Sequence, residues 1–468
     1  MPAMDFRTES LCGLADAVRS KRVGARELVA HALERIANVN PQVNAFVAVD
    51  GERALAEAAR IDDRVAAGES VGPLAGIPIG VKDLEPAAGF VTSFGSRLFA
   101  GDPPADADSV QVARLRAAGA VVVGKTNTPE EGWKGDTDNL VFGRTANPWS
   151  LTHSAGGSSG GSASAIAAGM VPLATGSDGG GSIRIPSALC GLTGMKASFG
   201  RVAVGGDAPG WVDLSARGPM ARRLADIAYA LEVVAGPHPT DPRSLPSAPG
   251  LFALDGLPAL PARVGWSPTL GYAPVDAQVA DITLGALKRL ADEGVEVLEI
   301  ETVFPEDPIR TFLTLANIGT LRALTAQRER WDLLDPGLRA GLEWAERSVT
   351  ALDYAEAIAE THRLSLRLHD VLSTLGLDVL ITPATAAVTP IAGQPGVING
   401  TPDQNWVRFT YPFNLTRSPA GVVNAGYTDN GLPIGLQVVG PMHGDRVVLE
   451  ALAAFEAVLG DDRLAPIR

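Results

Sequence analysis

Between residues 74 and 201, short apolar runs bounded by glycine alternate with stretches long enough to form a helix. Such runs predict buried strands, because a strand that is covered on both faces is apolar throughout. The predicted strands are 77–81, 120–123 and 173–176, and the predicted helices are 109–118 and 162–170. The small residues of the helix at 162–170 indicate a buried helix in close backbone contact with its neighbours. Alternation of strands and helices favours an α/β fold with a largely parallel or mixed sheet.

The rest of the chain has no linker, repeat or composition shift that marks a domain boundary, although 468 residues are many for one core. We therefore predict one large α/β unit over residues 1–468. Its expected parts are a helical segment at 1–70, a core at 74–201, a variable and mostly helical region at 202–375, and strands and a helix at 376–468 that return to the core.

Apolar side chains recur at helical spacing in several stretches outside the core segment. The predicted helices are 24–38, 276–293, 353–374 and 445–459, and the predicted strands are 378–382 and 433–440. Asp445 is expected to cap the last helix and Gly460 to end it, because these residue types are preferred at helix starts and stops.

The charge of the chain limits its partners. With 39 Lys and Arg against 53 Asp and Glu, the formal net charge is −14, which opposes nucleic-acid binding. Cys12 and Cys190 are too few for a disulfide framework. Because the sequence shows neither a secretory signal pattern nor an apolar stretch of membrane-spanning length, we expect a cytoplasmic protein with no membrane or nucleic-acid partner.

Residues 119–126, Gly-Ala-Val-Val-Val-Gly-Lys-Thr, match the P-loop pattern letter for letter. A P-loop needs flexible backbone between a strand and a helix, so that N–H groups can wrap phosphates. Here three valines fill the loop positions, and β-branched residues prefer strands. We therefore interpret the segment as a strand and a turn rather than as a nucleotide site.

Residues 156–160, Gly-Gly-Ser-Ser-Gly, fit the nucleophile-elbow pattern of hydrolases that use a Ser-His-Asp triad. That elbow requires a strand directly before the serine, whereas residues 147–155 have the composition of a loop. His153 lies near in sequence, but its surroundings give no sign of a catalytic role. The pattern alone therefore does not support a Ser-His-Asp triad.

A more informative set consists of Lys82, Ser158 and Ser182, each of which lies in its own glycine-rich segment. Serine is a poor nucleophile unless a base activates it. Glycine-lined backbone allows N–H donors to approach a developing oxyanion. Glycine-rich turns also accumulate serines for purely structural reasons, but a lysine at a strand end followed by two such serines points to acyl transfer.

Several segments, taken in order, resemble the amidase signature family. They are Gly-Ile-Pro-Ile-Gly-Val-Lys82-Asp-Leu, Gly-Lys-Thr-Asn-Thr-Pro-Glu, Phe-Gly-Arg-Thr-Ala-Asn-Pro-Trp, Gly-Gly-Ser158-Ser-Gly-Gly-Ser-Ala and Gly-Ser-Asp-Gly-Gly-Gly-Ser182-Ile-Arg-Ile-Pro. The resemblance is strongest over residues 74–201 and extends over most of the chain. It implies a single α/β domain whose mixed, mostly parallel central sheet is covered by helices on both faces. The segments beginning at Ser177 and Pro419 depart from the usual pattern of the family, which leaves the subgroup open.

The resemblance implies a Ser–cis-Ser–Lys mechanism that needs no cofactor or metal. Ser182 would be the nucleophile, Ser158 would relay protons after a cis peptide bond, and Lys82 would be a neutral base. Asp83 would point to the opposite face of the strand and leave Lys82 unpaired. The expected oxyanion hole consists of the backbone N–H groups of Gly179, Gly180, Gly181 and Ser182. The expected supporting residues are Ser159, Asp178 and Arg184.

The substrate is constrained less by the sequence. Family analogy places Phe94, Gly132 and Trp133 near the acyl pocket of a monomeric or homodimeric enzyme. We expect a small-molecule aryl or alkyl amide first, and a carbamate (urethane) or an ester second. The alternative is the glutaminase subunit of a tRNA-dependent amidotransferase, for which Arg408 or Arg417 would have to hold the carboxylate of glutamine.

Overall fold

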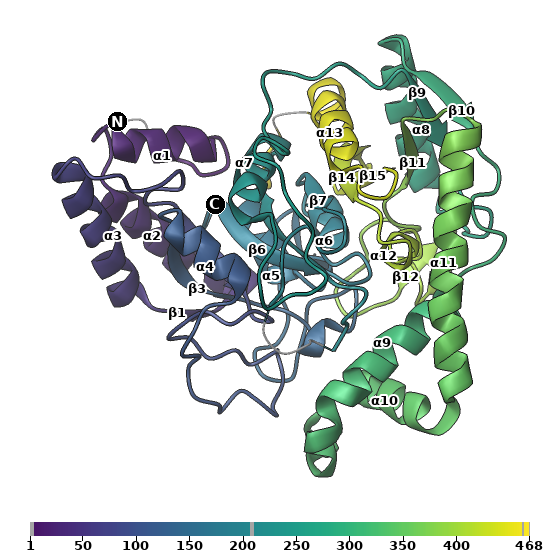
Figure 1. The fold of residues 1–468 in the computed structure, drawn as a ribbon, viewed down its shortest axis with the longest axis horizontal. Coiled ribbons are helices and arrows are strands. Elements are labelled where there is room, and N and C mark those ends of the chain that lie inside the picture. The colour runs from purple at the N-terminus through teal and green to yellow at the C-terminus, as the bar shows by residue number, and fades with distance from the viewer. Residues whose placement is uncertain (1–3, 206–209, 461–462, 468) are drawn as a thin grey trace.

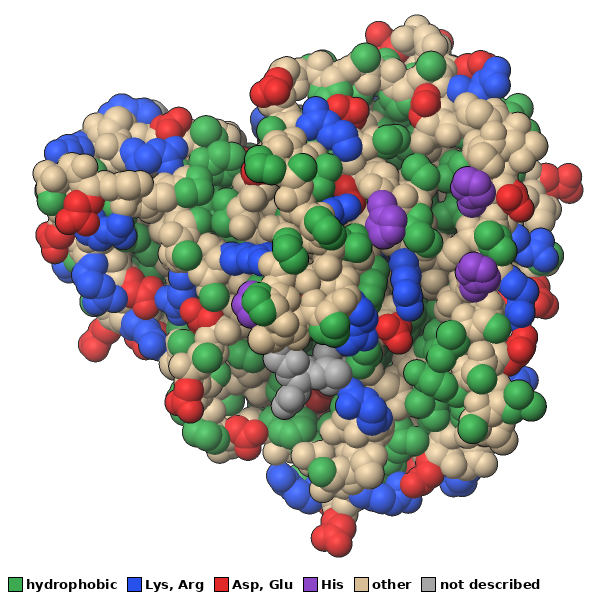
Figure 2. Space-filling model, viewed as in Figure 1, with side chains coloured by type: hydrophobic (Ala, Val, Ile, Leu, Met, Phe, Trp, Pro, Cys, Tyr) green, Lys and Arg blue, Asp and Glu red, His purple; other side chains and the backbone are tan. Residues whose placement is uncertain are grey.

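The computed structural model describes residues 4–205, 210–460 and 463–467. In Figure 1 the N-terminal helices lie at one side of the molecule, a first sheet lies next to them, a second sheet extends from the centre to the opposite side, and a group of long helices projects on that same side. Within the described residues, no helix combines the length and the apolar character needed to cross a membrane. Figure 2 shows acidic and basic side chains interspersed over one face, as on an ordinary solvated surface.

The N-terminal segment forms three helices and one strand, namely α1 (Leu11–Arg19), α2 (Ala25–Val43), β1 (Phe46–Val49) and α3 (Gly51–Ala66). Ser10 and Asp50 cap α1 and α3 by accepting a backbone N–H bond. The apolar stripe predicted for 24–38 is buried in the core. The expectation of a purely helical segment was incomplete, because β1 pairs with a strand of the first sheet.

The first sheet has the strand order β1-β3-β2-β6-β8 and surrounds the predicted catalytic lysine. Its other strands are β2 (Pro78–Lys82), β3 (Val121–Thr126), β6 (Leu173–Asp178) and β8 (Ala216–Ala221). β2 runs parallel to both β3 and β6, whereas the outer strands β1 and β8 are antiparallel to their neighbours. The centre of this sheet is therefore parallel, and the carboxyl ends of β2 and β6 lie at the same edge.

The second sheet has the order β10-β9-β11-β15-β14-β7. Its strands are β7 (Gly194–Lys196), β9 (Arg263–Trp266), β10 (Glu296–Glu299), β11 (Val379–Pro383), β14 (Ala420–Tyr427) and β15 (Pro433–Val439). Two short hairpins pair β4 (Ala146–Asn147) with β5 (Ser150–Ser154) and β12 (Gly396–Ile398) with β13 (Thr401–Asp403). The predicted α/β class with mixed sheets is confirmed, and the strands are divided between two sheets rather than gathered in one.

The remaining helices pack on these sheets or project from them (Figure 1). Those near the sheets are α4 (Val110–Ala117), α5 (Gly160–Ala167), α6 (Arg184–Leu189), α7 (Leu224–Val234), α8 (Ala277–Asp292), α12 (Pro412–Leu415) and α13 (Asp445–Leu459). The projecting group is α9 (Ile309–Leu324), η2 (Thr325–Leu333), α10 (Pro336–Ser348) and α11 (Ala351–Thr374). The region 202–375 is thus mainly helical, although it also supplies β8, β9 and β10.

One predicted helix cap was wrong. The residue that precedes α13 is Gly444, and Asp445 is its first helical residue. The carboxylate of Asp445 is buried, where it accepts a hydrogen bond from Ser198 N at 2.7 Å and pairs with Arg201 at 2.9 Å. These partners come from a distant part of the chain, so tertiary contacts override the local capping preference. Gly460 ends the helix as predicted.

Candidate active site

Lys82 lies at the carboxyl end of the central strand β2, and its side chain is completely buried. Its Nζ atom contacts three hydroxyl oxygens, at 2.8 Å from Ser158 Oγ, 2.8 Å from Ser159 Oγ and 2.9 Å from Ser177 Oγ. β6 supplies Ser177, and the glycine-rich turn that precedes α5 supplies the other two serines. The sheet thus fixes the amine, and two neighbouring segments bring hydroxyl groups to it.

The surroundings of Lys82 favour the neutral amine. Burial and the nearby positive charge of Arg217 hold the pKa of Lys82 well below its ordinary value, against the weaker influence of Glu85 and Asp178. Asp83 lies on the opposite side of the strand and pairs with Lys125 at 3.0 Å, as its position predicted. Lys82 is therefore left without a carboxylate partner, which suits a group that must accept a proton.

Ser158 and Ser182 approach each other from two turns that open helices α5 and α6. The Gly157–Ser158 peptide bond is cis, as predicted. Ser159 N donates a hydrogen bond to Ser182 O at 3.2 Å, which joins the two turns. Both serines line one cavity of about 250 Å³. Among the described residues no hydrogen bond connects the two Oγ atoms, and catalytic hydrogen bonds often tighten only when substrate is bound.

Gly132 shows how closely the polypeptide approaches Ser158. Its φ of +73° lies in the left-handed region, and a Cβ atom at this position would lie 2.8 Å from Leu84 Cδ1 and 3.1 Å from Ser158 Oγ. A larger residue would therefore press on the serine, in a conformation that only glycine adopts at low cost. The resemblance predicted that Gly132 lies at the acyl pocket, and Gly132 is indeed part of the cavity wall.

The glycine loop after β6 presents backbone donors beside Ser182. Gly181 N donates to Asp178 Oδ1 at 2.8 Å, so this N–H is already engaged. Within the described chain, the N–H groups of Gly179, Gly180 and Ser182 have no hydrogen-bond acceptor. Of the four N–H groups predicted to form the oxyanion hole, those of Gly179, Gly180 and Ser182 are therefore open in this structure, and that of Gly181 is engaged.

Asp178 and Arg184 form a fully buried ion pair beneath this loop. Arg184 Nη2 lies 2.9 Å from Asp178 Oδ1, and its guanidinium also donates to Thr410 O, Gln437 Oε1 and Asn414 Oδ1. Burial alone would raise the pKa of Asp178, but the charge and hydrogen bonds of Arg184 outweigh it and hold the pKa below its usual value. The pair thus joins the catalytic loop to the second sheet and to α12.

Breaking this ion pair should lower the stability of the folded protein. We expect Asp178→Asn to lower the free energy of unfolding by about 3–5 kcal/mol, because it leaves the buried Arg184 charge uncompensated. Urea denaturation followed by circular dichroism measures the change. The control is Glu356→Gln, which removes an exposed partner of Arg363 and should leave the midpoint essentially unchanged. Equal midpoints for the two variants would contradict a structural role for Asp178.

The cavity around the serines is mainly apolar, and two of the described side chains on its wall are charged. Phe94 lines it, as predicted from family analogy. Other lining side chains are Leu84, Phe99, Trp211, Leu324, Glu131 and Arg217. Trp211 lies over Gly179, since a Cβ atom there would be 2.4 Å from the indole ring. The cavity is large enough for a small organic group, and its shape depends on these rings.

Trp133 was wrongly predicted to line the cavity. Its ring instead packs against an apolar cluster that contains Trp331, Leu338 and Leu342 and that, among the residues described, reaches the cavity only through Phe99 and Leu324. A Cβ atom on Gly337 would lie 2.4 Å from the Trp133 ring, so α10 packs directly against the tryptophan. Trp133 therefore joins the catalytic core to the projecting helices.

The sequence and the structure both match known amidases. The family model described as Amidase matches residues 27–449. The chain belongs to the amidase family. An acylamidase from Rhodococcus erythropolis is 37% identical over 95% of this chain and 94% of its own length. A glutamyl-tRNA(Gln) amidotransferase subunit from Synechococcus sp. (strain CC9605) is 35% identical over 97% of both chains.

Solved structures agree with this assignment. The crystal structure of a bacterial aryl acylamidase of the amidase signature family superposes with a TM-score of 0.88 and 28% identity, over 96% of both chains. A 6-aminohexanoate cyclic dimer hydrolase complexed with its substrate gives a TM-score of 0.87 and 29% identity over 99% of both chains. The protein is thus an amide carbon–nitrogen hydrolase, as predicted.

The two misleading sequence patterns have structural explanations in this amidase. Residues 121–126 form strand β3, and Lys125 is buried with Asp83 and with Glu85 O at 2.7 Å. The P-loop pattern therefore describes a strand, as interpreted. The loop expected at 147–155 was wrong in part, because residues 150–154 form β5. His153 Nδ1 bonds with Ser150 Oγ at 2.8 Å within that strand, and His153 does not line the catalytic cavity.

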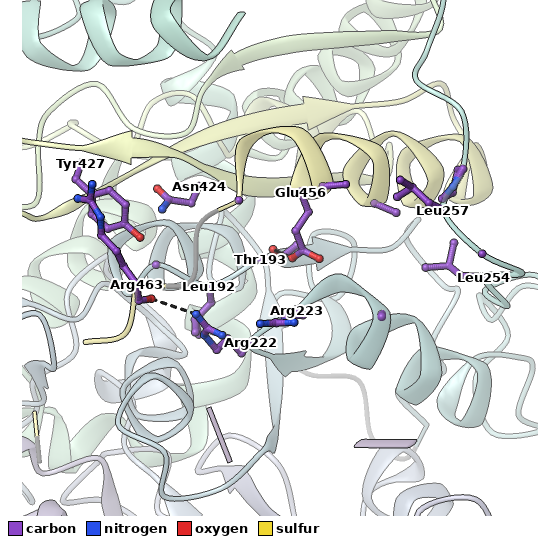
Figure 3. A pocket seen from close by; sticks show the side chains of 17 residues that line it. Leu192, Thr193, Arg222, Arg223, Leu254, Leu257, Asn424, Tyr427, Glu456 and Arg463 are labelled. Carbon is purple, nitrogen blue, oxygen red and sulfur yellow. Dashed lines mark hydrogen bonds between the residues drawn. The ribbon is translucent and has the colours of Figure 1, made fainter. Parts of the chain in front are cut away.

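A second and larger cavity, of about 500 Å³, lies between α7, α13 and the end of β14 (Figure 3). Arg222, Arg223, Arg463, Tyr427 and Glu456 line it, and Arg222 donates a hydrogen bond to Arg463 O. Neither Ser158 nor Ser182 lines this cavity. Size alone therefore does not identify the active site of this amidase.

Sequence reasoning missed Glu131, Arg217 and Trp211 as cavity residues. Glu131 is adjacent to the predicted Gly132, so its proximity could have been inferred. Arg217 lies in β8, which reaches the site only because that strand pairs with β6. No local pattern in the sequence marks that pairing.

Proposed function

We propose that this amidase cleaves aryl or alkyl amides of small molecules through an acyl-enzyme on Ser182. Lys82 and Ser158 would activate the nucleophile. The observation that carries the proposal is the 2.8 Å contact between the buried Lys82 Nζ and Ser158 Oγ, in a turn that shares a cavity with Ser182. A base held in its neutral form, next to a hydroxyl relay, is what serine activation requires.

In the proposed reaction, Ser182 Oγ attacks the carbonyl carbon of the substrate. Its proton passes to Ser158 Oγ as the proton of Ser158 passes to Lys82 Nζ. When the tetrahedral intermediate collapses, the proton returns by the same route to the departing nitrogen, and the amine leaves. Water then attacks the acyl-enzyme with the same assistance, releasing the acid and restoring Ser182.

The open N–H groups of Gly179, Gly180 and Ser182 would bind the oxyanion. They lie on one loop that Asp178 holds through Gly181 N and Ile183 N. Fixed backbone donors of this kind stabilise charge without reorganising during the reaction, and losing a single donor costs about 2.7–4 kcal/mol in a protease. Asp178 and Arg184 would act here as positioning residues.

The apolar cavity wall supports an uncharged aryl or alkyl portion in the substrate, which its aromatic rings can cover. Relatives named acylamidase and aryl acylamidase support the same class. Carbamates and esters remain the second choice, because the same acyl transfer applies to them. We further propose that the protein is a cytoplasmic monomer or homodimer. The net charge of −14 supports the proposal that it has no nucleic-acid partner.

The alternative function is that of a glutaminase subunit, which the Synechococcus relative supports. The two predicted carboxylate clamps do not line the catalytic cavity. Arg408 pairs with Asp403, and Arg417 lies over the Phe199 ring. These contacts favour the amidase proposal over the glutaminase one.

A substrate panel tests the proposal. We expect the purified chain alone to hydrolyse anilides and aliphatic amides, to cleave carbamates more slowly, and to release little ammonia from glutamine. Ser182→Ala is the control for each substrate. Glutamine hydrolysis that appears only with a partner subunit, together with no anilide turnover, would favour the glutaminase function instead.

The activity should depend on pH through Lys82. Only the neutral amine accepts a proton, so kcat/KM should fall as pH decreases through the pKa of Lys82. Because burial and Arg217 lower that pKa, the fall should be centred well below 10.5. The measurement is a pH profile of kcat/KM with an uncharged anilide. Activity that rises only near 10.5, or that declines as pH rises through the neutral range, would contradict a neutral Lys82.

A further inference from the structure

Among the described residues, one carboxyl group on the wall of the catalytic cavity has no hydrogen-bond or ion-pair partner. Glu131 lines the cavity, and within the described chain its carboxyl oxygens take part in no hydrogen bond or ion pair. The residue has a φ of +54°, in the left-handed region that residues other than glycine seldom adopt. Its backbone N–H is held by Phe94 O at 2.8 Å. The turn therefore holds this glutamate at the cavity although its side chain contributes no bond there.

The other charged groups described near Glu131 have partners of their own, although Arg217 Nη1 makes no hydrogen bond. Glu130 points away from the cavity, where it binds Ser96 Oγ and Asp335 N. Arg217 also lines the cavity, but Glu85 Oε1 lies 3.4 Å from its guanidinium. Among the described residues that line the cavity, Glu131 thus carries the uncompensated carboxyl group, and burial together with the charge of Glu130 raises its pKa to about 8.

A partly buried carboxyl among apolar rings is costly unless a cation or a donor reaches it. A positively charged group on the substrate would supply the partner that the described protein residues do not offer to the Glu131 carboxyl group. Glu131 is well placed for such contact, because the next residue, Gly132, is packed against Ser158 Oγ. The net charge of −14 would also attract a cationic ligand.

We propose that Glu131 determines specificity by binding an ammonium group on the substrate, so that the preferred substrates are amides that carry a basic amino group at some distance from the scissile bond. This inference rests on the proposed amidase function and specifies its substrate class. The carboxylate and the ammonium group would form a charge-assisted hydrogen bond inside the cavity.

The test compares matched substrates. One set consists of ω-aminoacyl 4-nitroanilides and mono-acetylated diaminoalkanes, and the other replaces each amino group with a methyl group. We expect the wild type to prefer the charged member of at least one pair. Glu131→Gln should reduce that preference by tenfold or more, chiefly through KM, because the neutral amide cannot pair with the ammonium group. Glu301→Gln, which changes an exposed carboxylate, should retain the wild-type preference.

The pH dependence of the preference gives a second readout. Between pH 7 and 9 the preference for the charged substrate should increase in the wild type, because Glu131 ionises while an alkyl ammonium, with a pKa of about 10.4, stays charged. The preference should be flat with pH in Glu131→Gln. A preference that is unchanged by Glu131→Gln, or an equal loss with both members of every pair, would overturn the inference.

The outcomes also separate this inference from the function on which it rests. Turnover of the uncharged anilides that disappears in Ser182→Ala supports the proposed function whatever Glu131 does. If those anilides are turned over but the charge preference does not depend on Glu131, only the inference is wrong. If Ser182→Ala remains active, the proposed function fails.

Discussion

Ser182→Ala is expected to lower kcat/KM by about 10⁵-fold or more, as loss of the nucleophile does in a serine protease. The alanine variant has no oxygen that can attack the substrate carbonyl, although the cavity and the backbone donors remain. The same variant should no longer be labelled by a sulfonyl fluoride. Initial rates with an anilide and intact-mass spectrometry after labelling measure the two effects.

The matched control is Ser373→Ala, at an exposed position near the end of α11. This variant should keep wild-type activity and labelling, which shows that loss of a serine hydroxyl as such has no effect. Near-normal turnover in Ser182→Ala would place the nucleophile elsewhere. Equal unfolding midpoints for both variants would show that the loss of activity is chemical.

The second large effect is expected for Lys82. Replacement by alanine should lower kcat at neutral pH by about 10³–10⁴-fold, since positioned general bases contribute roughly this factor or somewhat less. Without Nζ, Ser158 has no acceptor to which it can pass the proton of Ser182. Steady-state kinetics with an uncharged anilide measure the loss.

Lys82→Arg distinguishes a base from a positive charge. Arginine carries a permanent positive charge in proteins, so it cannot accept the proton. We expect this variant to be about as inactive as Lys82→Ala. Substantial activity in Lys82→Arg would mean that charge at this position, rather than basicity, supports the reaction.

The three residues proposed to carry out the reaction could be predicted from the sequence for a physical reason. Lys82, Ser158 and Ser182 each lie in a glycine-rich segment, and such segments place polar groups at turns where backbone can approach them closely. The strand periodicity also separated Lys82 from Asp83, and the structure shows the aspartate paired with Lys125 on the other side. The local sequence was therefore enough to predict that Lys82 and Asp83 lie on opposite faces of the strand, and that both serines lie in glycine-rich turns.

Long-range pairing explains what could not be predicted. Arg217 reaches the cavity through the β6–β8 pairing, and Trp133 turns away because α10, more than 200 residues later, packs on it. Gly181 could not be removed from the oxyanion donors until Asp178 was seen to accept its N–H. In each case the deciding partner is distant, or its orientation depends on packing that local patterns do not encode.

In the proposed mechanism an acyl group becomes covalently attached to Ser182 during turnover. Rapid acid quenching of the enzyme with an activated ester substrate, followed by peptide mapping, tests this claim directly. We expect a mass increase equal to the acyl group on the peptide that contains Ser182, and no such increase in Ser182→Ala. An acyl group found on a different residue, or turnover with no adduct even when deacylation is slowed by Lys82→Ala, would contradict it.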